Sequence, residues 1–154
     1  MMSLCCDVLN SLTGKTLATA ESCTGGAIGS VLTAVPGSSA VYKGGVVSYC
    51  NEIKHKLLGV DMDLLDSVGA VSAPVAAAMA AGVMKLMDAD VAVSVTGLAG
   101  PGGDEFGNPV GTVFIGYADS SHSLAVEYHF EGDREAVRRQ AVESAMKLIL
   151  HYNS

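Results

Sequence analysis

The sequence predicts an α/β fold, a three-layer α/β/α sandwich around a mixed, mostly parallel sheet of about five strands. Short segments rich in β-branched residues alternate with longer segments of helical periodicity, as they do in βαβ units. Near the C-terminus, strand-like segments at residues 111–118 and 123–130 are separated only by a polar turn, which predicts a hairpin and some antiparallel pairing. Because 154 residues suffice for one core, we expect a single domain over residues 1–154.

The N-terminal segments are expected to form a helix and the first two strands. Residues 4–12 have helical spacing of apolar residues, and residues 16–21 alternate small, apolar and β-branched residues as a strand does. A polar, glycine-rich run at residues 22–26 ends that strand. Helical periodicity then covers residues 25–35, and a second strand is expected over residues 40–50.

The middle of the chain is expected to be helical. Two short helical segments, residues 52–58 and 62–68, precede a long helix that ends near Met87. Ser72 is placed to be the N-cap of that helix, because Pro74 follows it in the first turn. Its richness in alanine and methionine predicts that it is buried.

The C-terminal part begins with an expected strand at residues 90–94, which leads into a glycine-rich loop. The hairpin follows. A final helix is expected over residues 134–151, with Asp133 as its N-cap.

Composition and charge exclude several classes of protein. Hydrophobic residues make up 49% of the chain and charged residues 16%, so the chain is not disordered. The formal net charge of −7 argues against nucleic acid as a partner. We find no uncharged apolar run of about eighteen residues and no secretory signal, so we expect no membrane partner and a cytoplasmic protein. The apolar long helix leads us to expect a homo-oligomer.

The four cysteines and four histidines show neither CxxC nor HxxxH spacing. We therefore expect no metal site, and we interpret the cysteines as reduced, mostly buried thiols of a cytosolic protein.

Ser22 lies between the end of an expected strand and the start of an expected helix. Backbone N–H groups and the helix dipole favour negative charge at such a position. The N–H groups of Cys23, Thr24, Gly25 and Gly26 could therefore hold an oxyanion beside a serine nucleophile, although the GxSxG pattern is absent. The ordinary alternative is that Ser22 only caps the helix.

Lys54 is the candidate base for Ser22. No histidine stands beside a plausible carboxylate partner, whereas Lys54 follows the second expected strand, whose end lies beside Ser22 if the two strands are parallel neighbours. Burial would have to lower the pKa of Lys54 for it to act at neutral pH. Tyr49 could relay the proton or hold the lysine. The ordinary alternative is a solvated helix lysine.

Two further regions are candidates for substrate binding. The loop after the third expected strand, with Gly97 and Gly100, could bring backbone N–H groups against a phosphate or ribose, although neither GK[ST] nor GxGxxG is present. Arg134 and Arg138 are four residues apart on one helix face and could clamp a phosphate. Plain turn geometry explains the loop equally well, and surface ion pairs with nearby glutamates are the ordinary alternative for the arginines.

A serine-lysine spacing of the SxxK type also occurs at Ser144 and Lys147. This short pattern fits the ordinary amphipathic spacing of the last helix, and we expect no catalytic role for it.

Considered together, ordered segments from residue 4 to the end resemble the C-terminal domain family of the competence/damage-inducible protein CinA. The matching stretches are residues 19–26, 36–39, 49–54, 69–72, 96–103, 109–113 and 132–134.

Stand-alone members of that family include nicotinamide-nucleotide amidases. The resemblance therefore implies hydrolysis of nicotinamide mononucleotide, a pyridine nucleotide, to nicotinate mononucleotide and ammonia, with no metal or organic cofactor. It maps the family's serine, tyrosine and lysine onto Ser22, Tyr49 and Lys54. We further expect Thr96 and the glycine loop to line the nucleotide site, with Arg134 or Arg138 near the phosphate. Larger members carry an additional N-terminal domain, and we do not transfer its different hydrolase activity.

Two alternatives stay open. One is a non-catalytic nucleotide-binding or regulatory module, and the other is an amidase for a different small amide. The chain departs from the family pattern at Asn108, where a lysine is common, and at Cys50, where a small polar residue is common.

Overall fold

The computed structural model describes residues 1–154 and contains one five-stranded sheet flanked by six α-helices and a short 3-10 helix. The strands are β1 (Leu17–Glu21), β2 (Tyr42–Val47), β3 (Val91–Gly97), β4 (Thr112–Ala118) and β5 (Ser123–His129). The helices are α1 (Met2–Ser11), α2 (Ala27–Thr33), the 3-10 helix η1 (Ser38–Ala40), α3 (Asn51–Leu58), α4 (Met62–Val68), α5 (Ala73–Met87) and α6 (Arg134–Asn153).

The sheet has the strand order β2-β1-β3-β4-β5. Strand β1 pairs in parallel with β2 and with β3, whereas β4 is antiparallel to both β3 and β5. Strand β4 is thus the one that runs against the other four, which confirms a mixed sheet with mostly parallel strand directions. The β4–β5 hairpin turns at residues 119–122, as expected.

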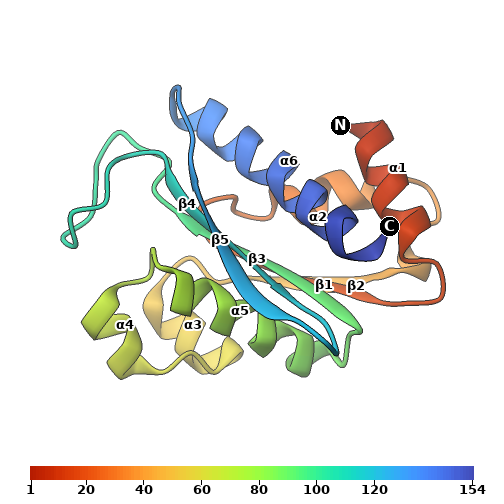
Figure 1. The fold of residues 1–154 in the computed structure, drawn as a ribbon, viewed down its shortest axis with the longest axis horizontal. Coiled ribbons are helices and arrows are strands. Elements are labelled where there is room, and N and C mark those ends of the chain that lie inside the picture. The colour runs from red at the N-terminus through yellow and green to blue at the C-terminus, as the bar shows by residue number, and fades with distance from the viewer.

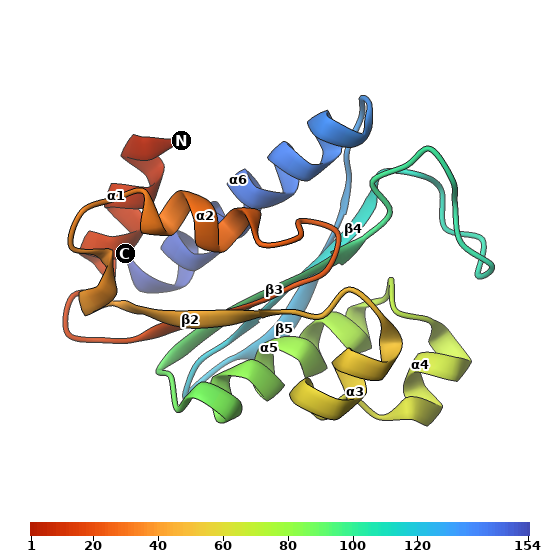
Figure 2. The ribbon, with the colours of Figure 1, turned by 180° about the vertical axis from the view of Figure 1, so that it is seen from behind.

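The helices form two layers, one on each face of the sheet (Figures 1 and 2). Helices α1, α2 and α6 cover one face, and α3, α4 and α5 cover the other. The fold is therefore the expected three-layer sandwich. None of the helices combines the length and the apolar character needed to cross a membrane.

Helix α5 is buried because its small residues let it approach the sheet. Ala76, Met79 and Val83 are fully buried. A side chain at Gly116 of β4 would overlap the carbonyl oxygen of Ala76, and this close approach explains why the helix is rich in alanine. The burial expected for this helix is confirmed for the face that packs on the sheet, whereas Ala81, Lys85 and Leu86 on its other side are exposed.

Local signals predicted the element ends unevenly. Asp133 is the N-cap of α6, and its carboxylate accepts a hydrogen bond from the Ala136 N–H at 2.9 Å, as expected. Ser72 occupies the N-cap position of α5, but its hydroxyl donates to the Gly69 carbonyl and does not cap the helix. Strand β3 runs on to Gly97 because its last residues pair with β4, a partner that local sequence could not reveal.

The parallel strands place their carboxyl ends at one edge of the sheet. Ser22 follows β1, Ser48 follows β2, and Thr96 lies at the end of β3. In open α/β sheets, ligands bind outside the carboxyl ends of the strands. The topology therefore gathers the candidate residues of three separate chain segments at this edge.

Candidate active site

A pocket of about 290 Å³ opens at this edge of the sheet. Its lining includes the candidate residues Ser22, Tyr49, Lys54, Thr96 and Arg134. Cys23 and the glycines Gly97 and Gly100 also line it. Most of the residues predicted from the sequence are thus neighbours in the folded chain.

Ser22 and Lys54 form a buried pair. The Lys54 Nζ atom donates hydrogen bonds to the Ser22 Oγ at 3.1 Å and to the Ser48 carbonyl oxygen at 2.7 Å. Only 2% of Lys54 and 8% of Ser22 are exposed. Since the Ser48 N–H also donates to the Glu21 carbonyl, the ends of β1 and β2 lie side by side, as we expected for parallel neighbours.

Burial sets the proton affinity of the groups around this pair. Desolvation lowers the pKa of the Lys54 ammonium below its ordinary value, and only a negative charge on Cys50 or Cys23, in the thiolate form, would oppose this shift. Burial raises the pKa of the Cys23 thiol to about 11, so this neighbour of Ser22 stays protonated at neutral pH. The serine is therefore the better candidate nucleophile.

The N-terminus of α2 is occupied by the side chain of Glu21, which no sequence motif marked as part of the site. The Glu21 carboxylate accepts hydrogen bonds from the N–H groups of Gly26, Ile28 and Gly29 at 3.2, 2.9 and 3.1 Å. The helix terminus is consequently not free to hold an oxyanion, which corrects our expectation for Gly26. Ser22 does not cap the helix either, because Gly26 is the N-cap residue.

Within the loop after Ser22, only some N–H groups remain available. The Gly25 N–H donates to the Ser22 carbonyl oxygen at 3.0 Å, so the expected oxyanion role of Gly25 is also corrected. The N–H groups of Cys23 and Thr24 donate to no protein acceptor. Of the four residues considered from sequence, these two keep free donors.

The two arginines of α6 contact different loops and do not share one anion position. Arg134 lines the pocket and donates to the Gly100 carbonyl at 2.7 Å and to the Tyr49 hydroxyl at 3.1 Å. Arg138 donates to the carbonyl oxygens of Cys23 and Thr24 at 3.0 and 3.1 Å and is not part of the pocket lining. The paired phosphate clamp is therefore not formed, and neither arginine makes a salt bridge.

Tyr49 lies at the rim of the pocket, 63% exposed, with its hydroxyl bound to Arg134. It makes no hydrogen bond to Lys54, so the structure does not contain the direct contact that we considered from the sequence. Its hydroxyl is bonded instead to Arg134, which comes from α6 at the far end of the chain.

The loop that follows β3 is tied down by its own contacts. The Thr96 hydroxyl donates to the Ala70 carbonyl at 2.9 Å, which fastens the end of β3 to the segment before α5. A side chain at Gly97 would collide with Val113, so glycine allows the neighbouring strand to come close. Asn51 and Val71 also line the pocket and were not singled out from sequence, although both lie in matching stretches.

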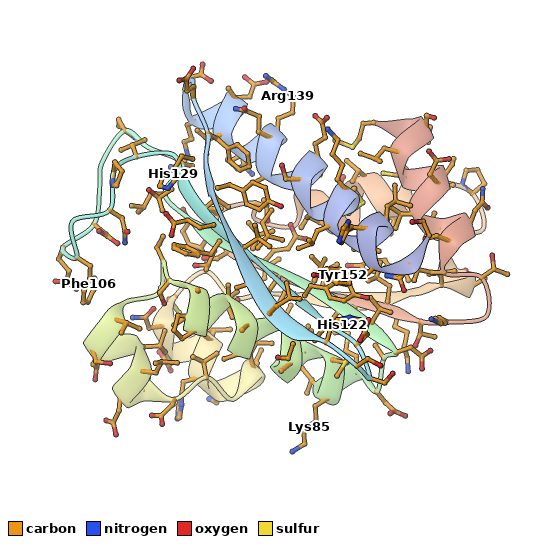
Figure 3. All side chains as sticks on the ribbon, in the orientation of Figure 1. Lys85, Phe106, His122, His129, Arg139 and Tyr152 are labelled. Atoms are coloured by element: carbon orange, nitrogen blue, oxygen red, sulfur yellow. The ribbon has the colours of Figure 1, made fainter.

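Other possible centres are less well equipped. Lys147 of the SxxK spacing forms an ion pair with Glu143 at 2.9 Å on the surface of α6. Its role is therefore that of an ordinary surface residue. A larger cavity of about 500 Å³, near His122 and Tyr152, lies at the opposite edge of the sheet and contains no serine bonded to a base (Figure 3). No group of three or more His, Cys, Asp or Glu side chains is arranged to hold a metal ion.

Comparisons with known proteins identify the family to which this fold belongs. The family model described as the CinA C-terminal domain matches residues 3–153. A CinA-like protein of Geobacter metallireducens is 52% identical over 134 residues, which cover 87% of this chain but 32% of that protein. A CinA-like protein of Thermotoga neapolitana is 47% identical over 133 residues, covering 86% of this chain and again 32% of the relative. The chain thus spans only part of the length of these curated relatives.

Solved structures match over nearly the full chain. A competence-damaged protein (CinA) superfamily protein from Klebsiella pneumoniae superposes with a TM-score of 0.94 at 37% identity, covering 97% of this chain and 95% of that one. The competence/damage-inducible protein CihA from Agrobacterium tumefaciens gives a TM-score of 0.92 at 35% identity, covering 99% and 95%. The chain therefore belongs to the CinA C-terminal domain family of competence/damage-inducible proteins.

Proposed function

We propose that this domain hydrolyses the carboxamide of nicotinamide mononucleotide to nicotinate mononucleotide and ammonia. The observation that carries the proposal is the buried 3.1 Å hydrogen bond between Lys54 Nζ and Ser22 Oγ. A lysine buried to this extent loses affinity for its proton, which is what a base for a serine hydroxyl requires.

In the proposed reaction, the Ser22 Oγ attacks the carboxamide carbon while neutral Lys54 accepts the hydroxyl proton. The Ser48 carbonyl, 2.7 Å from Lys54 Nζ, orients the amine. The free N–H groups of Cys23 and Thr24 stabilise the tetrahedral oxyanion. Lys54 then passes its proton to the departing ammonia, and water, deprotonated by the same lysine, cleaves the acyl-enzyme.

The charges at the pocket rim support a substrate with a phosphate. Arg134 is exposed at the rim, and its present partners are a backbone carbonyl and the hydroxyl of Tyr49. A phosphate would be a stronger, charge-assisted partner for this guanidinium than a neutral hydroxyl is. In the proposed complex, the phosphate replaces the Tyr49 hydroxyl as the acceptor of the Arg134 hydrogen bond. Tyr49 is then free to assist the proton transfer through Lys54.

Two other functions remain to be separated from this one. A nucleotide-binding module would keep Arg134 but would not release ammonia. An amidase for another small amide would use Ser22 and Lys54 but would show no preference for the phosphorylated nucleotide.

The test is ammonia release from nicotinamide mononucleotide by the wild type and by Ser22→Ala and Lys54→Met, each checked for folding. Exposed Ser30 and Lys56 provide the matched controls Ser30→Ala and Lys56→Met. We expect Lys54→Met to lose at least about 10²-fold in turnover, the usual contribution of a positioned proton acceptor, Ser22→Ala to lose at least as much because it has no nucleophile, and both controls to keep it. Saturable binding without turnover by the wild type would favour the binding module, and faster turnover of an unrelated small amide would favour the other amidase.

A further inference from the structure

We infer that Arg138 is a positioning residue for the oxyanion hole and not a phosphate ligand. The inference rests on the proposed acyl transfer at Ser22. It assigns to Arg138 the task of fixing the direction of the Thr24 N–H group.

The side chain of Arg138 contacts backbone carbonyls and no acidic partner. Its side chain is half-buried, makes no salt bridge, and donates from Nε to the Cys23 carbonyl and from Nη2 to the Thr24 carbonyl at 3.0 and 3.1 Å. The planar guanidinium holds its donors in a fixed fork, so bonds to two successive carbonyls fix the orientation of both peptide planes. The segment held in this way directly follows the candidate nucleophile.

Peptide geometry carries this orientation to the free donors. The peptide bonds of the loop are trans, so each N–H points away from the carbonyl of the preceding residue. The Thr24 N–H is therefore directed away from Arg138, because the Cys23 carbonyl points toward it. The Cys23 N–H is directed in the same manner by the Ser22 carbonyl, which accepts a hydrogen bond from Gly25.

Thr24 itself lacks the partners that a buried polar residue normally has. The residue is fully buried, its N–H donates to no protein acceptor, and its Oγ1 is the one buried side-chain oxygen or nitrogen without a hydrogen bond. Leaving such groups unsatisfied costs about 1–3 kcal/mol each, so they mark a place that a reacting group completes. Arg138 holds this segment in place from the side of the loop that faces α6.

A contact across the loop agrees with this placement. A side chain added at Gly25 would lie 3.5 Å from Arg138 Nη2, so the guanidinium packs against the back of the loop. Arg134, one helical turn earlier, remains the arginine that lines the pocket. The two arginines thus have separate tasks, and substrates with and without a phosphate distinguish them.

The experiment compares Arg138→Met and Arg138→Lys with the control Arg139→Met. Arg139 is exposed, makes no hydrogen bond and points away from the sheet (Figure 3). Kinetics are measured on nicotinamide mononucleotide and on nicotinamide riboside, which lacks the phosphate. We expect Arg138→Met to lower kcat by roughly 10–10²-fold on both substrates with KM little changed, since removing an oxyanion donor altogether costs about 10²–10³-fold. Added methylguanidine should restore part of that kcat.

A rise in KM confined to the phosphorylated nucleotide would overturn the inference and make Arg138 a phosphate ligand. Wild-type kcat in Arg138→Met would also overturn it. If Arg138→Met fails to fold, Arg138→Gln, which keeps a single donor group, its amide NH₂, is compared with the same control.

A second measurement separates failure of this inference from failure of the proposed function. In acetylation by p-nitrophenyl acetate, the Ser22 Oγ–acetyl bond forms, p-nitrophenolate leaves, and the serine proton passes to Lys54. This reaction needs the same oxyanion hole but no nucleotide. If the wild type is acetylated at Ser22 but does not deamidate the nucleotide, slower acetylation of Arg138→Met than of Arg139→Met supports the inference. Equal rates, or no acetylation at Ser22, overturn it.

Discussion

Lys54 and Ser22 are 32 residues apart in the chain, yet the lysine amine lies 3.1 Å from the serine hydroxyl in the folded protein. The approach is produced by two parallel neighbours, because Ser22 follows β1 and Lys54 lies on the helix that follows β2. The turn from β2 into α3 also brings the amine against the Ser48 carbonyl. Position and desolvation of the base thus have one structural origin, and both can be tested.

The pH profile of the amidase should report the buried lysine. Because burial lowers the pKa of Lys54 from its ordinary value of 10.5, kcat/KM should rise with pH and level off below that value. The measurement is kcat/KM for nicotinamide mononucleotide between about pH 6 and pH 10, the range that spans the expected shift. If kcat/KM rises with an apparent pKa at or above the ordinary lysine value, Lys54 is not the base.

The stability of Lys54→Met relative to the wild type should depend on pH. Between the lowered pKa of folded Lys54 and its ordinary pKa, the unfolded chain binds a proton that the folded chain does not. Wild-type stability therefore rises with pH across this window, and the cost of Lys54 is greatest below it. The melting temperature of Lys54→Met should therefore increase relative to that of the wild type as the pH falls.

This shift can be measured by thermal unfolding at several pH values, with Lys56→Met beside it. Lys56 is exposed on the same helix, so its substitution should show no such dependence. If the melting temperature of the wild type instead increases relative to that of Lys54→Met as the pH falls, the folded state favours charged Lys54.

Glu21→Gln should destabilise the protein. The carboxylate of Glu21 accepts three N–H groups at the start of α2, whereas an amide would turn a donor toward some of them. We expect the free energy of unfolding to fall by about 1–3 kcal/mol, the cost of unsatisfied buried groups. The free energy of unfolding is measured by denaturant unfolding, with the exposed Glu131→Gln as the control. Equal free energies for the two variants would show that Glu21 does not stabilise the start of α2.

Arg134→Met should weaken the binding of a phosphorylated substrate. If the guanidinium takes the phosphate, KM for nicotinamide mononucleotide should rise by about tenfold or more, in line with the loss of a charge-assisted hydrogen bond. The KM for nicotinamide riboside should change little. Equal losses on both substrates would assign Arg134 to holding the Gly100 loop, whose carbonyl it contacts at 2.7 Å.

Much of the fold was predictable because its signals are local. The strands at residues 111–118 and 123–130, the burial of α5 and the cap at Asp133 follow from periodicity and short-range hydrogen bonding. The partnership of Ser22 and Lys54 was also accessible, since it required only that β1 and β2 be parallel neighbours.

By itself, the sequence determined the α/β class and the order of the elements, and it offered Lys54 as a candidate base for Ser22; the parallel pairing of β1 with β2 in the folded chain brings the two together. The tertiary structure decided the tasks of the side chains around that pair: Glu21 at the start of α2, Tyr49 beside Arg134, and Arg138 behind the Thr24 loop. Arg138 and the Cys23 carbonyl are 115 residues apart in the chain. Such contacts depend on how α6 packs on the sheet, and a long, flexible side chain carries no local signal of the partner it will meet.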